Sequence, residues 1–359
     1  MGINQGIMTV MAFGVVLGGV DRMLGNRFGF REKFESGFRM LGPVGLSMAG
    51  IICLAPLLSS MLGGVVRPLC HWLGMDPSIF ASILSIDMGG YPLAMELAED
   101  PQLGRFCGVI VSSVFGCTIV FTIPVGLSAI TQADRPYFTR GILLGFLAMP
   151  FSILAGGLVM GLSLGTILWN TLPVLLIALV LAIGVIKWPQ TMMKGFGVFA
   201  GLIRIVSTFG LVLAAVTQLT GLVFWEQMPP LWEAMKTVCS ICVVMLGSMP
   251  LAELIQRLMK VPFSWIREKT GLNGTSTTGL LLGMVSATPT LAMIPEMDRR
   301  GQVVCSCCLV CYLGVFGSHL AYTMDCEPEL VPALLATKLV GGVATAAIAL
   351  FATRETKKG

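Results

Sequence analysis

The stretch that decides the fold reads Ser85-Ile86-Asp87-Met88-Gly89-Gly90-Tyr91-Pro92, inside an apolar segment of about residues 78–98. A second apolar segment, about residues 276–297, is interrupted in the same way by Ser286-Ala287-Thr288-Pro289-Thr290. Polar, Gly and Pro residues in succession break a helix, and the bilayer core has no water to satisfy the freed backbone groups. We therefore expect two broken helices, each covered by protein or lining a water-filled cavity.

The composition around these segments is that of an integral membrane protein. The 359 residues are 55% hydrophobic and 12% charged, with a mean hydropathy of +0.86, whereas soluble domains carry about 25% charge. The net charge of +4 is small and dispersed, so the expected partner is the lipid bilayer and not nucleic acid. Most of the 11 cysteines lie in apolar stretches, where a thiol packs as a small hydrophobe, so we expect reduced thiols, no metal site and no cofactor.

Apolar runs of about 20 residues are long enough to cross a hydrocarbon core about 30 Å thick. We expect an all-α polytopic membrane protein with nine full spans and two re-entrant hairpins. The nine spans are expected at about residues 3–24, 40–62, 104–129, 140–163, 166–186, 195–220, 234–258, 302–324 and 331–352.

The re-entrant assignment rests on the distribution of Lys and Arg, which collect in cytoplasmic loops. With both broken segments re-entrant and the N-terminus outside, 18 of these residues fall in inner loops and 2 in outer loops. If both segments crossed, the division would be 11 against 9. We therefore predict a multi-pass protein of the cell inner membrane with a periplasmic N-terminus and a cytoplasmic C-terminus.

Internal similarity predicts an inverted repeat within a single transport domain, residues 1–359. Pro92-Leu93-Ala94-Met95 recurs as Thr290-Leu291-Ala292-Met293, each just after a polar break. The first repeat covers about residues 40–163 with the hairpin at 78–98. The second covers about residues 234–352 with the hairpin at 276–297. Inverted repeats with broken helices form substrate sites in many secondary transporters, although a single Gly or Pro kink need not mark a site.

Asp87 is the most informative candidate for substrate binding. A carboxylate near the bilayer centre costs about 2.5–3.5 kcal/mol, so it is rarely kept without a partner or a task. The C-terminal end of a half-helix adds partial negative charge beside it, and both features favour a cation. The alternative is a buried salt bridge with Arg204 or Lys338.

The other candidates supply backbone, aromatic rings, hydroxyls and one imidazole. Hydroxyls around Pro289 suit a small polar substrate, and aromatic rings suit an ammonium group, while His319 accepts a hydrogen bond or moves a proton. A histidine or threonine that only packs within its helix remains an alternative. The full candidate set with Asp87 is Gly89, Gly90, Tyr91, Phe115, Ser286, Thr288, Thr290, Ser318 and His319.

Two common enzyme signatures are missing from the sequence, which contains no phosphate-binding Gly-x-x-x-x-Gly-Lys-Ser/Thr loop and no His-Glu-x-x-His. We therefore expect a transporter and not an enzyme. Without an ATP site, the driving force is an ion gradient or the gradient of the substrate itself.

The chain resembles the ethanolamine permease family of ethanolamine-utilisation operons (EutH). The resemblance runs from the first span to the last. It is carried by Asp87-Met88-Gly89-Gly90, Gly116–Pro124, Ala155-Gly156-Gly157, Gly247-Ser248-Met249-Pro250, Met297–Val304, His319-Leu320 and Lys338–Gly342. The resemblance implies uptake of protonated ethanolamine across the bacterial inner membrane, with Asp87 holding the ammonium.

Two other functions stay open. One is a carrier coupled to Na⁺ or H⁺ for another small polar solute, such as an amino alcohol, a nucleoside or a carboxylate. The other is a membrane scaffold or sensor that recruits enzymes without moving solute. A homo-oligomer is also left open.

Overall fold

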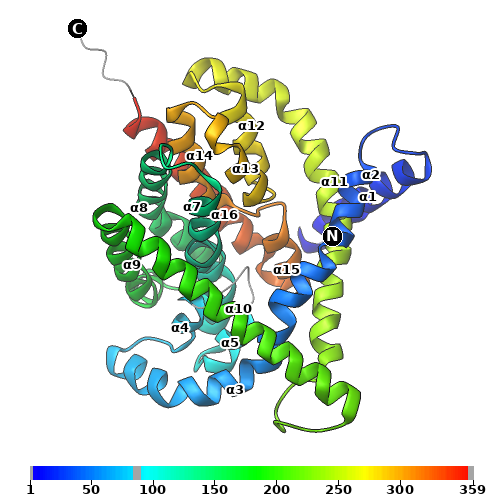
Figure 1. Ribbon diagram of the computed structural model, residues 1–359, viewed down its shortest axis with the longest axis vertical. Coiled ribbons are helices and arrows are strands. Elements are labelled where there is room, and N and C mark those ends of the chain that lie inside the picture. Colours follow the sequence, from blue (N-terminus) through cyan, green and yellow to red (C-terminus); the bar gives the residue numbers. More distant parts are fainter. Residues whose placement is uncertain (1–2, 84–89, 355–359) are drawn as a thin grey trace.

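The protein is an all-α polytopic membrane protein (Figure 1). The computed structural model describes residues 3–83 and 90–354, and the regular elements within these ranges are all helical. Among them, eight helical stretches are long and apolar enough to cross a membrane. They are Gln5–Met23, Arg31–Leu73, Pro101–Ala129, Arg135–Val159, Leu164–Leu181, Gln190–Thr220, Leu231–Leu258 and Pro328–Ala352. Eight of the nine expected spans are thus confirmed as helices of sufficient length and hydropathy.

The long helices surround shorter ones that carry the irregular backbone. The long helices are α1 (Ile3–Met23), α3 (Leu41–Leu73), α8 (Arg135–Val159), α9 (Leu164–Lys187), α10 (Pro189–Thr220), α11 (Leu231–Thr270) and α16 (Val331–Ala352). The short ones are α2 (Arg31–Arg39), α4 (Ser78–Ile83), α5 (Gly90–Leu97), α6 (Pro101–Arg105), α7 (Ile123–Ala129), α12 (Gly274–Gly283), α13 (Ala287–Met293), α14 (Arg299–Tyr312) and α15 (Ser318–Cys326). Two π-helices, η1 (Phe106–Gly116) and η2 (Thr118–Thr122), and two 3₁₀ turns, η3 (Ile294–Glu296) and η4 (Pro328–Leu330), complete the series.

The expectation of one continuous helix over residues 302–324 was wrong. The chain forms α14 and α15 there, separated by Leu313–Gly317. Leu313 has extended backbone, with ψ of 132°, and Gly314 has a φ of +71°, which a residue with a side chain rarely adopts. The helix therefore stops at Tyr312 and resumes at Ser318, although the intervening residues are almost all apolar.

Each of the two segments predicted as hairpins, residues 78–98 and 276–297, has its start and end held together by one carboxylate. At the first hairpin, Asp76 Oδ2 accepts hydrogen bonds from the backbone N–H groups of Glu99, at 3.1 Å, and Asp100, at 3.0 Å. At the second, Asp298 Oδ1 accepts from the Asn273 backbone N–H at 3.0 Å and from the Ser276 hydroxyl at 2.6 Å. The pair α4 and α5 and the pair α12 and α13 lie toward opposite ends of the molecule (Figure 1).

The core lies where α8, α14 and α16 pack together around η1. Glycines allow these helices to approach closely, as at Gly145, where an added Cβ would meet the Val310 side chain. All eleven residues of η1 are buried. A π-helix of this length is rare, and π-helical turns occur frequently at functional sites. The expected span at 104–129 is therefore confirmed as helical, with π-helical backbone through much of its length.

Candidate substrate cavity

A cavity of about 350 Å³ lies where the break inside the second hairpin meets the break between α14 and α15. Its walls come from Val285–Thr288, from Leu313, Gly314, Ser318 and His319, and from facing residues of α3, η2 and α11. This volume is at the small end of ligand sites, which are typically about 300–1,000 Å³. The cavity is therefore suited to a small solute.

Main-chain contacts hold the two breaks against each other. The Phe316 backbone N–H donates a hydrogen bond of 2.9 Å to the Met284 carbonyl, which follows the last turn of α12. Next to it, Gly317 lies so close to the Val285 carbonyl oxygen that a Cβ at this position would overlap it. A side chain at residue 317 would thus push the two breaks apart and open the cavity wall.

Four of the predicted site residues line this cavity, namely Ser286, Thr288, Ser318 and His319. They come from two segments that are about 30 residues apart in sequence but adjacent at the two breaks. The imidazole of His319 is buried, with 1% of its residue surface exposed, while Ser286 and Ser318 are partly exposed. The structure therefore gathers three hydroxyl groups and one imidazole at one wall.

Other predicted site residues lie elsewhere. Tyr91 donates a hydrogen bond of 2.5 Å from its hydroxyl to Glu327 Oε1, and Phe115 is fully buried in η1. Thr290 donates from its hydroxyl to the Gly279 carbonyl at 3.0 Å, which ties α13 to α12. Gly90 is buried at the start of α5. Asp87 and Gly89 fall outside the described residues.

Sequence reasoning did not single out several residues that face the cavity. Phe121 of η2 and Met249 of α11 line it, together with Ser47 of α3 and Cys117. Two signals were available, because Phe121 lies in the family-like stretch Gly116–Pro124 and Met249 in Gly247–Pro250. The ring of Phe121 can attract an ammonium group through its π face, and the thioether of Met249 adds a polarisable contact.

Two basic residues were considered as partners for Asp87, and they have different surroundings. Lys338 is completely buried, and its Nζ donates a hydrogen bond of 2.6 Å to the Ser113 carbonyl in η1. Arg204 is exposed on the outer face of α10. The described lining of the cavity includes no Asp or Glu. Within residues 3–83 and 90–354, no three His, Cys, Asp or Glu residues are grouped to hold a metal ion.

Comparison with known proteins places this architecture in a family. The sequence profile described as "Ethanolamine utilisation protein, EutH" matches residues 3–352. The chain belongs to the EutH family.

Relatives of the EutH family match over the full length of the chain. The probable ethanolamine permease EutH of Listeria monocytogenes serotype 1/2a (strain 10403S) is 37% identical over 100% of this chain and 96% of its own length. The probable ethanolamine permease EutH of Escherichia coli (strain K12) is 33% identical over 98% of this chain and 96% of its own. The uncharacterized protein YxeR of Bacillus subtilis (strain 168) is 37% identical over 98% of this chain. No solved structure matches the chain.

Membership of the EutH family confirms the resemblance drawn from the sequence. It also confirms the expectation of a multi-pass membrane transporter and not an enzyme, because the relatives from Listeria and Escherichia coli are named as probable permeases.

Proposed function

We propose that this EutH-family protein carries protonated ethanolamine into the cell across the bacterial inner membrane, driven by the ethanolamine gradient and the membrane potential. The observation that supports this proposal is the 350 Å³ cavity between two helix breaks, lined by hydroxyls, an imidazole, methionines and a phenylalanine. A small solute with one hydroxyl and one ammonium group matches that lining. The names of the relatives from Listeria and Escherichia coli indicate ethanolamine as the substrate.

The two ends of ethanolamine form different hydrogen bonds, so each end suits a different part of the cavity. The alcohol end both donates and accepts hydrogen bonds, as do the hydroxyls of Ser286, Thr288 and Ser318. The ammonium end donates only, so it needs acceptors or a negative charge. In this proposal Asp87 supplies that charge, Gly89 and Gly90 allow its backbone to approach, and Phe121 and Met249 complete the apolar wall. Tyr91, Phe115 and Thr290 then support the site from outside the cavity.

We further propose that residues 78–98 and 276–297 are re-entrant hairpins of an inverted repeat, with the N-terminus in the periplasm. The closure of each hairpin by Asp76 and by Asp298 supports this topology, because the start and end of each segment lie together. So does the position of the two hairpins toward opposite ends of the molecule (Figure 1). The repeat equates Val114-Phe115-Gly116, in the π-helix, with Val315-Phe316-Gly317, in the break between α14 and α15.

The driving force follows from the charge of the substrate. A membrane potential of 100 mV, negative inside, is worth about 2.3 kcal/mol per charge, or roughly fifty-fold accumulation of a cation. A uniporter is therefore sufficient, and the absence of a recognisable ATP-binding motif in the sequence is consistent with it.

Uptake of labelled ethanolamine by proteoliposomes tests the proposal. The full-length protein is reconstituted, and uptake is measured at acid and alkaline pH, with and without an imposed potential that is negative inside. We expect protein-dependent uptake at acid pH, where the amine is charged, with a strong increase when the potential is applied. Uptake that matches protein-free vesicles at acid pH would exclude the permease function. Uptake that requires Na⁺ in the medium would exclude the uniport mechanism.

A further inference from the structure

Three cavities that share lining residues extend from the substrate cavity to α2. The substrate cavity and a narrow cavity of about 110 Å³ share Met249, Val285 and Ser286 in their walls. The narrow cavity and a wide, open one of about 680 Å³ share Lys33 and Ser36 of α2. In the proposed topology the wide cavity opens to the cytoplasm. The narrow cavity, the smallest of the three, lies between the other two and is named the constriction.

An ion pair lies in this constriction. Lys33 of α2 and Glu253 of α11 both line the narrow cavity, and Lys33 Nζ is 3.5 Å from Glu253 Oε2. The other carboxylate oxygen, Oε1, accepts a hydrogen bond of 2.9 Å from Arg257 Nε. The two oxygens of Glu253 thus have separate partners. A contact of 3.5 Å is longer than a charge-assisted hydrogen bond, which is about 2.7–2.9 Å, so Lys33 is the weaker partner.

Arg257 is fixed by further contacts. Its Nη1 donates to the Phe28 carbonyl at 2.6 Å, and its guanidinium lies over the Phe30 ring, 4.4 Å from the centroid. Among the described residues, the side chain of Lys33 has the ion pair with Glu253 and no further contact of the kind that fixes Arg257. In addition, 41% of the Lys33 side chain is exposed. Of the two cations at Glu253, Lys33 is the one that can leave.

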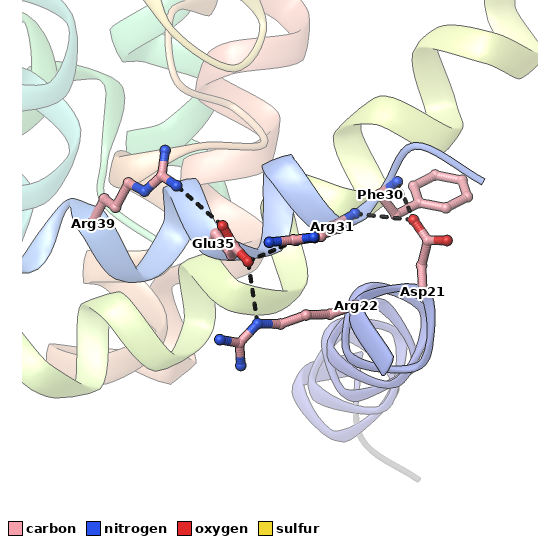
Figure 2. A network of polar contacts seen from close by, with 6 residues as sticks. All are labelled: Asp21, Arg22, Phe30, Arg31, Glu35 and Arg39. Carbon is pink, nitrogen blue, oxygen red and sulfur yellow. Dashed lines mark hydrogen bonds and ion pairs between the residues drawn. The ribbon is translucent and has the colours of Figure 1, made fainter. Parts of the chain in front are cut away.

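The backbone beneath Lys33 is anchored, so only the side chain has to move. Figure 2 shows that Glu35 of α2 is paired with three arginines, Arg22, Arg31 and Arg39. Asp21 at the end of α1 accepts hydrogen bonds from the backbone N–H groups of Phe30, at 2.7 Å, and Arg31, at 3.0 Å. These contacts hold the start of α2 in place.

We propose that Glu253 is a second binding residue for the substrate ammonium, on the inward side of the substrate cavity. A primary ammonium carries the same charge and the same three N–H donors as the Lys33 side chain. The substrate ammonium takes the place of Lys33 at Oε2, while Arg257 keeps Oε1 and holds the carboxylate in position. When the ammonium leaves for the wide cavity, Lys33 returns and closes the constriction. This inference rests on the permease function proposed above.

Two variants that break the same ion pair distinguish this role from a merely structural one. Glu253→Gln removes the acceptor for both Lys33 and the substrate. Lys33→Gln removes only the competitor and leaves Glu253 with Arg257. In proteoliposomes we expect Glu253→Gln to lower the rate of ethanolamine uptake at least tenfold. We expect Lys33→Gln to take up ethanolamine several-fold faster than wild type, because the competing ammonium is gone, and Glu253→Asp to recover part of the lost rate.

Controls separate this inference from folding and from the permease function itself. Glu296→Gln makes the same charge change at an exposed residue that lines none of the three cavities, and its uptake should stay within twofold of wild type. The melting temperature of each detergent-solubilised variant should stay close to that of the wild type and report intact folding. Equal uptake by Glu253→Gln and wild type, or equal losses in Glu253→Gln and Lys33→Gln, would overturn the role of Glu253. No uptake by the wild type would instead overturn the permease function.

Discussion

The ammonium nitrogen of Lys338 lies 2.6 Å from the carbonyl oxygen of Ser113, and the lysine side chain is completely buried. This contact joins the middle of α16 to the π-helix η1. A buried ammonium is costly unless it is paired or hydrogen-bonded. A cation is thus already built into the interior of the protein, next to the backbone that departs most from regular α-helix.

We expect Lys338→Met to destabilise the protein, because it keeps the aliphatic length but removes the charged donor to Ser113. A hydrogen bond to a charged group is worth about 1.5–3 kcal/mol, and thermal unfolding in detergent should show a loss of that size. The exposed Lys187 gives a matched control, and Lys187→Met should change stability by less than about 0.5 kcal/mol. Equal melting temperatures for wild type and Lys338→Met would contradict the structural role of this contact.

Gly317→Ala should separate the two helix breaks. Its Cβ would overlap the Val285 carbonyl oxygen, which is backbone and cannot rotate away. Overpacking of this kind costs about 1–3 kcal/mol, and we expect uptake to fall at least tenfold because the cavity wall is displaced. Gly201→Ala in α10 is the control, because a Cβ there has no neighbour within 4 Å. Uptake and melting temperature should be unchanged in the control variant.

Asp87→Asn should abolish uptake of the charged amine, because the amide keeps the shape of the side chain but removes its negative charge. Proteoliposome uptake at acid pH, with an imposed potential, measures this directly. Glu329→Gln, at an exposed carboxylate, should transport normally. Normal uptake by a folded Asp87→Asn protein would show that the ammonium is neutralised elsewhere.

The two hairpin ends should be accessible from opposite sides of the membrane. Glu99→Cys and Arg299→Cys, each at an exposed residue, are labelled with an impermeant maleimide in intact cells and in inverted vesicles. The background carries Cys239→Ser, because Cys239 is exposed. We expect position 99 to react from the periplasmic side and position 299 from the cytoplasmic side. Labelling of both from one side would refute the inverted repeat.

Asp325 gives the stability of the protein a dependence on pH. Burial raises the pKa of its carboxyl above the ordinary value of 3.8, despite the opposing charge of Lys236 and a hydrogen bond from Ser240. The folded state therefore binds this proton more tightly than the unfolded state does. The contribution to stability is full below the ordinary value and is lost as the pH rises through the raised pKa.

Asp325→Asn removes this titration. Melting temperatures of wild type and variant in detergent should be most alike at pH 4, and the variant should gain relative to wild type as the pH rises to 7. A difference between the two proteins that does not vary with pH would contradict the raised pKa.

Much of the fold could be predicted from the sequence, because apolar length and polar interruption are local signals. Gly74-Met75-Asp76 and Gly271-Leu272-Asn273 occupy corresponding places, each shortly before one of the two broken segments. Both glycines have positive φ in the structure, at 66° and 71°. The break at Leu313–Gly317 was not predictable from hydropathy. It depends on the Met284 carbonyl and the close approach of Val285, which come from another segment.

The candidate site shows the same division. Ser286, Thr288, Ser318 and His319 line one cavity at the two helix breaks, but only the break at residues 286–290 was visible in the sequence. Tyr91 and Phe115 were chosen by nearness in sequence, which does not determine the direction of a side chain. Tyr91 instead bonds Glu327, which is 236 residues away. A contact between residues so far apart cannot be predicted from the residues next to Tyr91 in the sequence.

The hydrogen bond from Phe316 to Met284 is made between main-chain atoms, so no substitution of a side chain removes it directly. Its consequence is mechanical. If the second hairpin moves, residues 313–317 between α14 and α15 have to move with it. Otherwise the Phe316 N–H and the Met284 carbonyl lose this hydrogen bond inside the protein. The second hairpin is therefore coupled to residues 313–317, and in the proposed transport cycle we expect the two segments to move together.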